Sequence, residues 1–293
     1  MTKESNKVSV IGLGQMGKKL AQLYIDAGFD VSVWNRTRSK ASDLENVKIV
    51  NSAFDAIKDS TISILCVYDN NAVLEILESI TDNEIFAGKT ILNLTTGSPN
   101  EASEIEAIIT AQGGAYINGA IQVAPDQMGL NNTTVLLSGS RNVYLQNKSY
   151  LEVLGGNLKY LSEKPSASSA MDLAALTWLY GSYIGLIYAV TLCRRYDLKL
   201  EGFSAIIEEI TPGYTDFFKY EIDVINRGDY RITQSPLPIS VAATQRIADS
   251  FKELNVIQEF PEILAKILGE ANRKGLDHEE LAAIIKVIEK PKD

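Results

Sequence analysis

A glycine-rich segment near the start of the chain has the spacing of a dinucleotide-binding turn. Gly12, Gly14 and Gly17 form a GxGxxG pattern between the apolar run VSVIGL and a run with helical spacing. Glycines in this pattern permit a tight turn, let the backbone approach a pyrophosphate and let the helix pack on the strand. The free N–H groups and the dipole at the start of that helix favour a bound phosphate. The predicted dinucleotide contacts in this turn are Gly12, Leu13, Gly14, Gln15 and Met16.

The end of the second apolar run, VSVW, indicates which dinucleotide binds. NAD enzymes usually carry an acidic residue there, which binds the ribose hydroxyls. This chain has no carboxylate at that point and instead reads NRTRSK from Asn35 to Lys40. An Arg side chain donates two aligned hydrogen bonds to a phosphate, so this segment predicts recognition of the 2′-phosphate of NADPH. A solvated basic turn that binds nothing is the alternative. The predicted contacts are Asn35, Arg36, Thr37 and Lys40, with Arg38 as a further source of charge.

Two later apolar runs end in residues that we expect in the same crevice, because ligands of parallel sheets bind at the carboxyl ends of the strands. The run ISILCV ends at Cys66 and Val67, and the run TILNL is followed by Thr95 and Thr96. We expect these four residues to reach the nicotinamide ribose. The Ser-Pro that follows also has the pattern of an ordinary helix start, and both interpretations can hold together.

The pattern of predicted elements divides the chain into two parts. In residues 1–162, short apolar runs alternate with amphipathic helical runs, which predicts an α/β Rossmann domain with a mostly parallel sheet. In residues 163–293 the apolar residues recur at spacings of three and four, which predicts an all-α domain. A long interdomain helix over 165–196 joins the two, and we expect Pro212 to separate two of the later helices.

Residues 174–193 form an uncharged run inside the predicted long helix. The run is long enough to span a bilayer, but the hydroxyls of Thr177, Ser182 and Thr191 and the nearby carboxylate of Asp172 would be costly in lipid. We therefore expect a helix buried in protein and no membrane, with a membrane span as the less favoured alternative. One chain of this size offers too little cover for the helix, so we expect a homodimer formed through the helical domain.

The composition limits the partners and the reactions. The chain has 293 residues, of which 45% are hydrophobic and 22% charged, as in a soluble globular protein. Its net charge of −9 argues against a nucleic-acid partner. The single histidine, His278, and the two separated cysteines provide neither a metal site nor a Ser-His-Asp triad. Isolated thiols and an N-terminus without a signal-peptide pattern favour the cytoplasm.

Five segments, taken in order, resemble the imine reductases of the β-hydroxyacid dehydrogenase superfamily. They are GLGQMG, WNRTRSK, NLTTGSPNEA, YINGAIQVAPDQMG and a long helix that begins near MDLAAL. The first two segments occur throughout the superfamily, whereas the last two distinguish its members. Residues 162–166 depart from the family, because SEKPS replaces its Gly-x-acidic run. The resemblance implies NADPH-dependent reduction of the C=N bond in small cyclic imines.

The resemblance also implies that Asp172 occupies the catalytic position. Hydroxyacid dehydrogenases of the superfamily carry a Lys there and bind a substrate carboxylate with a Ser-Gly-Gly segment, where this chain has Gln122-Val123-Ala124. A Lys would repel a protonated iminium, whereas a carboxylate at about 4 Å would attract it by about 4 kcal/mol at an effective dielectric near 20. We therefore expect Asp172 to hold or protonate the C=N nitrogen, and we place Gln122 among the cofactor contacts. A solvated residue near a helix N-terminus is the alternative for Asp172.

The sequence also predicts a substrate pocket, and two functions other than imine reduction stay open. The predicted pocket residues are Met128, Trp178, Tyr180 and Tyr183, although aromatic residues on such a helix more often lie in a core or an interface. An NADPH-dependent hydroxyacid or aldehyde reductase that has lost its lysine would reduce aldehydes and no imine. A non-catalytic NADPH-binding dimer would bind the cofactor without any turnover.

Overall fold

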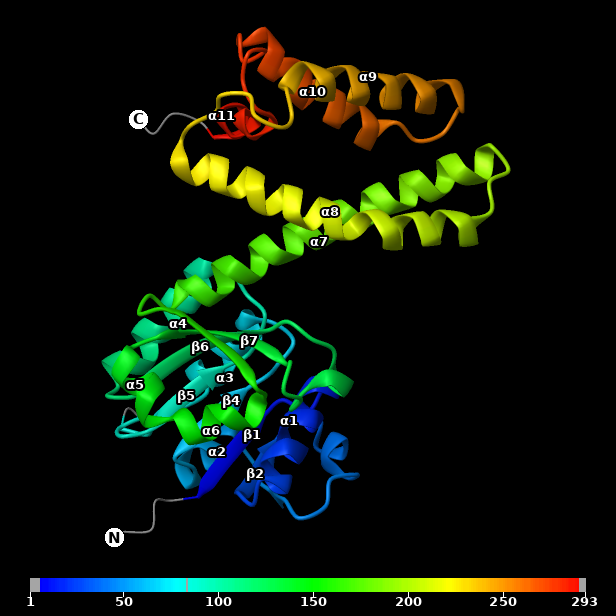
Figure 1. Ribbon diagram of the computed structural model, residues 1–293. Coiled ribbons are helices and arrows are strands. Elements are labelled where there is room, and N and C mark those ends of the chain that lie inside the picture. Colours follow the sequence, from blue (N-terminus) through cyan, green and yellow to red (C-terminus); the bar gives the residue numbers. More distant parts are fainter. Residues whose placement is uncertain (1–5, 83, 290–293) are drawn as a thin grey trace. The chain divides into compact units, whose positions relative to one another are not determined.

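The chain, described by a computed structural model over residues 6–82 and 84–289, divides between Trp178 and Leu179 into two units. The first unit holds a sheet with helices on both faces, and the second unit is helical (Figure 1). The predicted fold class is therefore confirmed. The long helix α7, Ser166–Arg195, runs from the first unit into the second, as expected. It is long and apolar enough to cross a membrane by length and composition, and none of its most apolar window is buried.

An eight-stranded sheet with the order β3-β2-β1-β4-β5-β6-β7-β8 organises the first unit. All neighbouring strands are parallel except β6 and β7. The strand order reverses between β1 and β4, and the crevice at the carboxyl ends of these strands is where such sheets bind ligands. The strands are β1 Lys7–Ile11, β2 Asp30–Trp34, β3 Lys48–Ile49, β4 Ile62–Leu65, β5 Thr90–Asn93, β6 Ala115–Ile121, β7 Thr134–Gly139 and β8 Asn157–Ser162.

Two hydrophobic cores, one on each face, hold the helices against this sheet. Side chains alternate along a strand, so Val8 and Val10 of β1 pack with Leu20 of α1, whereas Ile11 packs with Val73 of α3 on the opposite face. The helices of this unit are α1 Gln15–Asp26, α2 Ala53–Asp59, α3 Asn70–Glu78, α4 Pro99–Ala111, α5 Arg141–Gln146 and α6 Lys148–Leu151, with short 3-10 turns η1 Arg38–Ala41, η2 Pro125–Gln127 and η3 Glu152–Leu154.

Within the residues that the structure describes, the second unit contains the C-terminal half of α7, four further helices and one 3-10 turn. Ring contacts join Tyr188 of α7 to Phe251, edge to face with centroids 5.2 Å apart, and to Phe260, stacked with centroids 5.4 Å apart. Our prediction of a break at Pro212 was wrong, because α8 continues through it. A proline removes one hydrogen bond of a helix interior, and the long apolar face on both sides outweighs that cost. The further elements are α8 Leu200–Arg227, α9 Leu237–Glu253, α10 Glu259–Arg273, η4 Leu281–Ile284 and α11 Ile285–Ile288.

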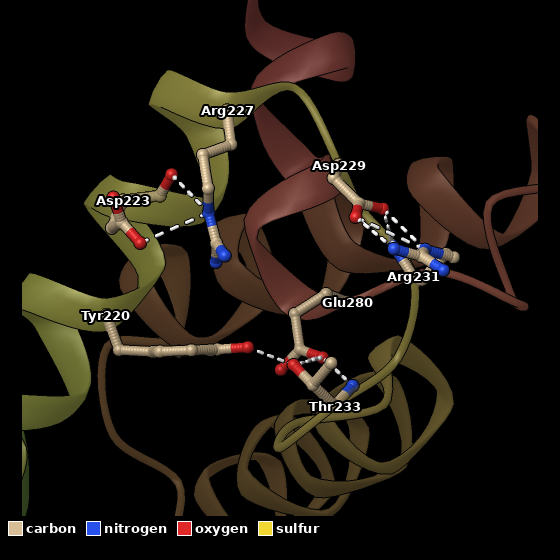
Figure 2. Close-up of polar contacts among 7 residues, drawn as sticks. All are labelled: Tyr220, Asp223, Arg227, Asp229, Arg231, Thr233 and Glu280. Atoms are coloured by element: carbon tan, nitrogen blue, oxygen red, sulfur yellow. Dashed lines mark hydrogen bonds and ion pairs between the residues drawn. The ribbon is translucent and has the colours of Figure 1, made fainter.

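A buried carboxylate organises the loop between α8 and α9. Glu280 accepts a hydrogen bond of 2.6 Å from the backbone N–H of Thr233 (Figure 2). It also accepts from the backbone N–H groups of Gln234 (3.1 Å) and Ser235. Burial alone would raise the pKa of Glu280, but these donors together bring it below its usual value. Glu221 is also buried, and its carboxylate oxygens have no hydrogen-bond partner among the described residues. Burial and the negative charge of Glu280 raise the pKa of Glu221.

Candidate active site

The glycine-rich turn joins β1 to α1 beside the point where the strand order reverses. Gly12 has a φ of +101°, and a Cβ there would overlap the carbonyl oxygen of Cys66. A Cβ at Gly17 would overlap the carbonyl oxygen of Gly12, so the turn requires glycine at both positions. Nothing lies within 4 Å of a Cβ placed on Gly14, which leaves room for a pyrophosphate against the backbone. Helix α1 begins without a side-chain cap and without an acidic residue in its first turn, which suits a phosphate.

The side chain of Asn35 braces this turn against the end of β2. Its Oδ1 accepts a hydrogen bond of 2.9 Å from the N–H of Leu13, and its Nδ2 donates to the carbonyl of Thr37 at 3.0 Å. Asn35 therefore links the glycine-rich turn to the loop after β2, and its two hydrogen bonds fix the shape of the predicted cofactor site. Thr37 itself is exposed at the start of η1.

The basic side chains beyond β2 differ in what they contact. Arg38 donates to the carbonyl of Val50 at 3.2 Å and to Oδ1 of Asn51 at 3.1 Å, so its guanidinium binds its own domain. The side chain of Arg36 is 87% exposed and only approaches Glu75, at 4.0 Å. Lys40 is exposed as well. Arg36 and Lys40 thus remain available for a phosphate.

The ends of β4 and β5 are tied together at the predicted nicotinamide side of the crevice. The N–H of Val67 donates to Oγ1 of Thr95 at 3.1 Å, which leaves Thr95 3% exposed, whereas Thr96 is exposed. Burial raises the pKa of the Cys66 thiol to about 11, so the thiol stays protonated at neutral pH. A Cβ on Gly97 would overlap the side-chain amide of Asn70, so the loop after β5 passes close to α3 at this glycine.

Asp172 lies in the second turn of α7 and is 6% exposed. Its Oδ1 accepts a hydrogen bond of 2.7 Å from Nε2 of Gln122, one residue beyond β6. We predicted Gln122 as a cofactor contact, and the structure makes it the direct partner of Asp172. No Lys or Arg within residues 6–82 and 84–289 forms an ion pair with Asp172. The carboxylate is therefore oriented by a neutral amide.

The predicted pocket residues lie in different surroundings. Met128, which we predicted to line an apolar substrate pocket, is 1% exposed and lies in the core that α1 covers. It follows the η2 turn, which directs its apolar side chain inward. Trp178 ends the first unit and is 67% exposed, while Tyr180 and Tyr183 of the second unit are 63% and 54% exposed.

Several buried polar residues near Asp172 were not among our predicted site residues. They form a hydrogen-bonded group on the side of the sheet where α7 begins, and they include Asn93, Tyr116, Asn118, Ser138, Ser168 and Ser169. The sequence did contain a signal for this group, because polar side chains interrupt the apolar runs TILNL and AYING. Polar groups buried in a sheet require hydrogen-bond partners, so these residues indicate a buried network. Within the part of the chain that the structure describes, no group of three His, Cys, Asp or Glu side chains could hold a metal ion.

Comparison with known proteins identifies the class to which this fold and site belong. Residues 7–162 match the NAD binding domain of 6-phosphogluconate dehydrogenase, and residues 164–290 match the C-terminal domain described as NADPH-dependent reductive aminase-like. The chain therefore belongs to the 6-phosphogluconate dehydrogenase-like NAD-binding family and, within it, to the reductive aminase-like proteins. The predicted resemblance to imine reductases is confirmed.

Individual relatives are similar over nearly the whole chain. An NADPH-dependent reductive aminase of Aspergillus oryzae is 30% identical over 96% of both chains. The structure of an imine reductase from a Pseudomonas species is 28% identical with a TM-score of 0.89, covering 97% of this chain and 99% of that one. A reductive aminase from Aspergillus terreus, solved with NADPH and ethyl levulinate, is 29% identical with a TM-score of 0.89 and the same coverage.

Proposed function

We propose that this protein reduces the C=N bond of small cyclic imines with NADPH, and that Asp172 is the residue that contacts the nitrogen. The observation that carries the proposal is the buried Asp172 carboxylate, which is held by a neutral amide and has no cationic partner among the described residues. Such a carboxylate favours a cationic iminium over a neutral carbonyl, because only the iminium brings a compensating charge.

The reaction requires a hydride at carbon and a proton at nitrogen. When bound, NADPH supplies the hydride, and the C=N carbon accepts it. Asp172 would hold the protonated nitrogen, which is worth about 4 kcal/mol at about 4 Å and an effective dielectric near 20. Gln122 would keep the carboxylate in one orientation through its 2.7 Å hydrogen bond. The amine would then leave with the proton it received.

Features of the first unit support the binding of a dinucleotide and a preference for NADPH over NADH. The space beside Gly14 and the uncapped start of α1 suit a pyrophosphate. The side chain of Arg36 is exposed where a 2′-phosphate would extend from the end of β2, and Lys40 adds positive charge. The other proposed contacts are Leu13, Gln15, Met16, Asn35, Thr37, Cys66, Val67, Thr95 and Thr96.

We also propose a cytoplasmic homodimer formed through the helical domain, whose start we place at residue 163. Many large apolar side chains are exposed along α7 and α8, and extensive exposed apolar surface marks interaction sites. They include Leu179, Ile184, Leu186, Ile187, Ile206, Ile210 and Phe218. A second copy of the chain is the favoured cover, because hydroxyl groups such as those of Thr177 and Thr191 would be costly in lipid. Met128, Trp178, Tyr180 and Tyr183 remain proposed pocket residues.

The test of the proposed reaction is NADPH consumption with a matched panel of substrates. The panel contains a methyl-substituted pyrroline, a ketone mixed with a primary amine, and succinic semialdehyde. We expect turnover of the preformed imine. Additional turnover of the ketone only when the amine is present would extend the activity to reductive amination. Turnover of the aldehyde alone would overturn the proposal in favour of an aldehyde reductase, and NADPH binding without any turnover would favour a non-catalytic dimer.

A further inference from the structure

A continuous chain of buried hydrogen bonds starts at the loop after β5, on the nicotinamide side of the predicted crevice. The N–H of Thr95 donates to Oδ1 of Asn93 at 3.0 Å. The Nδ2 of Asn93 lies 3.1 Å from the hydroxyl of Tyr116, which in turn lies 3.0 Å from Oδ1 of Asn118. These three side chains come from two neighbouring strands and are at most 2% exposed.

The chain continues from the sheet into the first turn of α7. The Nδ2 of Asn118 donates to Oγ of Ser168 at 2.8 Å and to Oγ of Ser169 at 2.9 Å. Ser138 of β7 then caps the helix from outside, because its hydroxyl accepts from the N–H of Ser168 at 3.1 Å and donates to the carbonyl of Pro165 at 2.8 Å. The hydroxyls of Ser138 and Ser168 are 2.7 Å apart.

Two backbone groups fix the direction of every bond in this chain. The N–H of Thr95 can only donate, so the oxygen of the Asn93 amide must face it and the nitrogen must face Tyr116. The tyrosine proton must then point to Asn118, whose nitrogen faces the serines. At the other end the carbonyl of Pro165 can only accept. Bonds aligned in one direction at low dielectric strengthen one another and specify a single arrangement.

We propose that this network is a positioning device for the reaction: it fixes the rotation and depth of the first turns of α7, and with them the place of Asp172 relative to the loop after β5. Asp172 lies four residues after Ser168, so the two occupy the same face of the helix. Gln122 adds a second contact on the following turn. The inference rests on the proposed function, in which Asp172 contacts the substrate.

Apolar side chains at these positions would pack the core without the cost of desolvating several polar groups. A purely structural role would therefore be served more simply by valine or alanine. The polar alternative restricts the helix to one position, because a displacement would leave buried donors and acceptors unpaired. Misplacement of a catalytic group by a fraction of an ångström is costly for rate, which gives this restriction a function.

The experiment compares Tyr116→Phe with Tyr24→Phe. Both tyrosines are buried in the first unit, and both substitutions remove one hydroxyl without changing the packing volume. Tyr24 donates to the carbonyl of Tyr150 at 2.9 Å and lies in the core on the other face of the sheet, outside the network. The measurements are imine kcat, NADPH affinity by fluorescence titration, thermal stability, and amide hydrogen exchange of the segment 166–172.

We expect Tyr116→Phe to lower imine kcat about 10-fold while the NADPH affinity is unchanged, because the misplaced carboxylate no longer meets the substrate. Exchange in the segment 166–172 should accelerate. Tyr24→Phe should lose similar stability and keep both wild-type kcat and wild-type exchange in that segment. In an Asp172→Ala background, Tyr116→Phe should reduce kcat little further, since residues that act through one group are not additive.

Three results would overturn the positioning role. If Tyr116→Phe changes neither kcat nor amide hydrogen exchange in the segment 166–172, the network serves only the packing of the core. The same conclusion follows if Tyr116→Phe and Tyr24→Phe have equal effects on kcat and on exchange. If the wild type reduces no imine, the proposed function fails, but the exchange comparison still decides whether the network holds the start of α7. Full additivity with Asp172→Ala would place the effect of Tyr116 elsewhere.

Discussion

Nε2 of Gln122 donates a hydrogen bond of 2.7 Å to Oδ1 of Asp172, which joins the end of β6 to the second turn of α7. This amide–carboxylate pair stands where the resemblance implies the Lys and the carboxylate-binding segment of the hydroxyacid dehydrogenases. Under the proposed function, a carboxylate in place of a Lys would change the sign of the charge at this point, and the site would stabilise a cation where a Lys would stabilise an alkoxide. The roles of Asp172 and Gln122 therefore have to be interpreted together.

Replacing Gln122 tests whether it serves Asp172 or the cofactor. Gln122→Met keeps the length of the side chain and removes the donor. A hydrogen bond to a charged group contributes about 1.5–3 kcal/mol, so we expect imine kcat to fall about 10-fold or more. The KM for NADPH should remain unchanged in steady-state kinetics. A raised KM for NADPH with wild-type kcat would instead make Gln122 a cofactor contact.

Arg36→Ala tests the recognition of the 2′-phosphate. Loss of a charge-assisted hydrogen bond at an exposed site should raise the KM for NADPH about 10-fold and leave that for NADH unchanged. Arg38→Ala is the matched control, because the neighbouring guanidinium is bound by Val50 and Asn51 of its own domain. It should reduce stability more than cofactor selectivity. Equal losses for both cofactors in Arg36→Ala would contradict the phosphate assignment.

The pH dependence of stability should reveal the buried carboxyl of Glu221. Burial and the charge of Glu280 raise its folded-state pKa, so its contribution to stability is present at acidic pH and is lost as the pH rises through that raised pKa. Glu221→Gln removes the titration. The Tm of the variant should exceed that of the wild type by more at pH 8 than at pH 5, as measured by thermal denaturation. A difference that is constant with pH would contradict this account.

Glu280 should behave in the opposite way. The folded-state pKa of Glu280 lies below the usual value. Its contribution to the stability of the fold is therefore present above the unfolded-state pKa and is lost as the pH falls through the folded-state pKa. Glu280→Ala leaves several backbone N–H groups without their acceptor, and we expect a loss of about 3 kcal/mol in the free energy of unfolding at neutral pH. An unchanged unfolding midpoint in urea would show that the loop after α8 does not depend on this carboxylate.

The proposed dimer predicts an effect of charge on the exposed face of α7. Ile187 is 45% exposed on the helix that we expect a second chain to cover. Ile187→Glu would bury an unpaired charge in that interface, and light scattering should report monomers. Ile257→Glu, at a residue 74% exposed between α9 and α10, is the control and should remain dimeric. A monomeric wild type would contradict the proposal.

The sequence predicted those parts of the fold and site that depend on local pattern. The glycine spacing, the alternation of strands and helices and the uncharged run of the long helix each reflect contacts within a few residues. The absence of a carboxylate after β2 is likewise visible in a single segment. These features were sufficient for the fold class and for the resemblance to imine reductases.

Features that depend on tertiary contacts were not predicted correctly. Strand β8 is only half-buried and carries no clear alternation, so we did not predict it. Pro212 was taken as a break because local propensity cannot show that the apolar face continues beyond it. The partner of Gln122 lies 50 residues further along the chain, and the pairing of Asn118 with Ser168 has the same separation.

The rate of NADPH consumption with a methyl-substituted pyrroline, compared between wild type and Asp172→Ala, tests the central claim most directly. General acid–base and charge-stabilising groups contribute at least about 100-fold in many enzymes, and we expect a fall in kcat of at least about 10-fold. NADPH affinity should be unchanged, because Asp172 is proposed to contact the substrate. An unchanged kcat for the imine would contradict the assignment and leave Asp172 as a residue of the helix start alone.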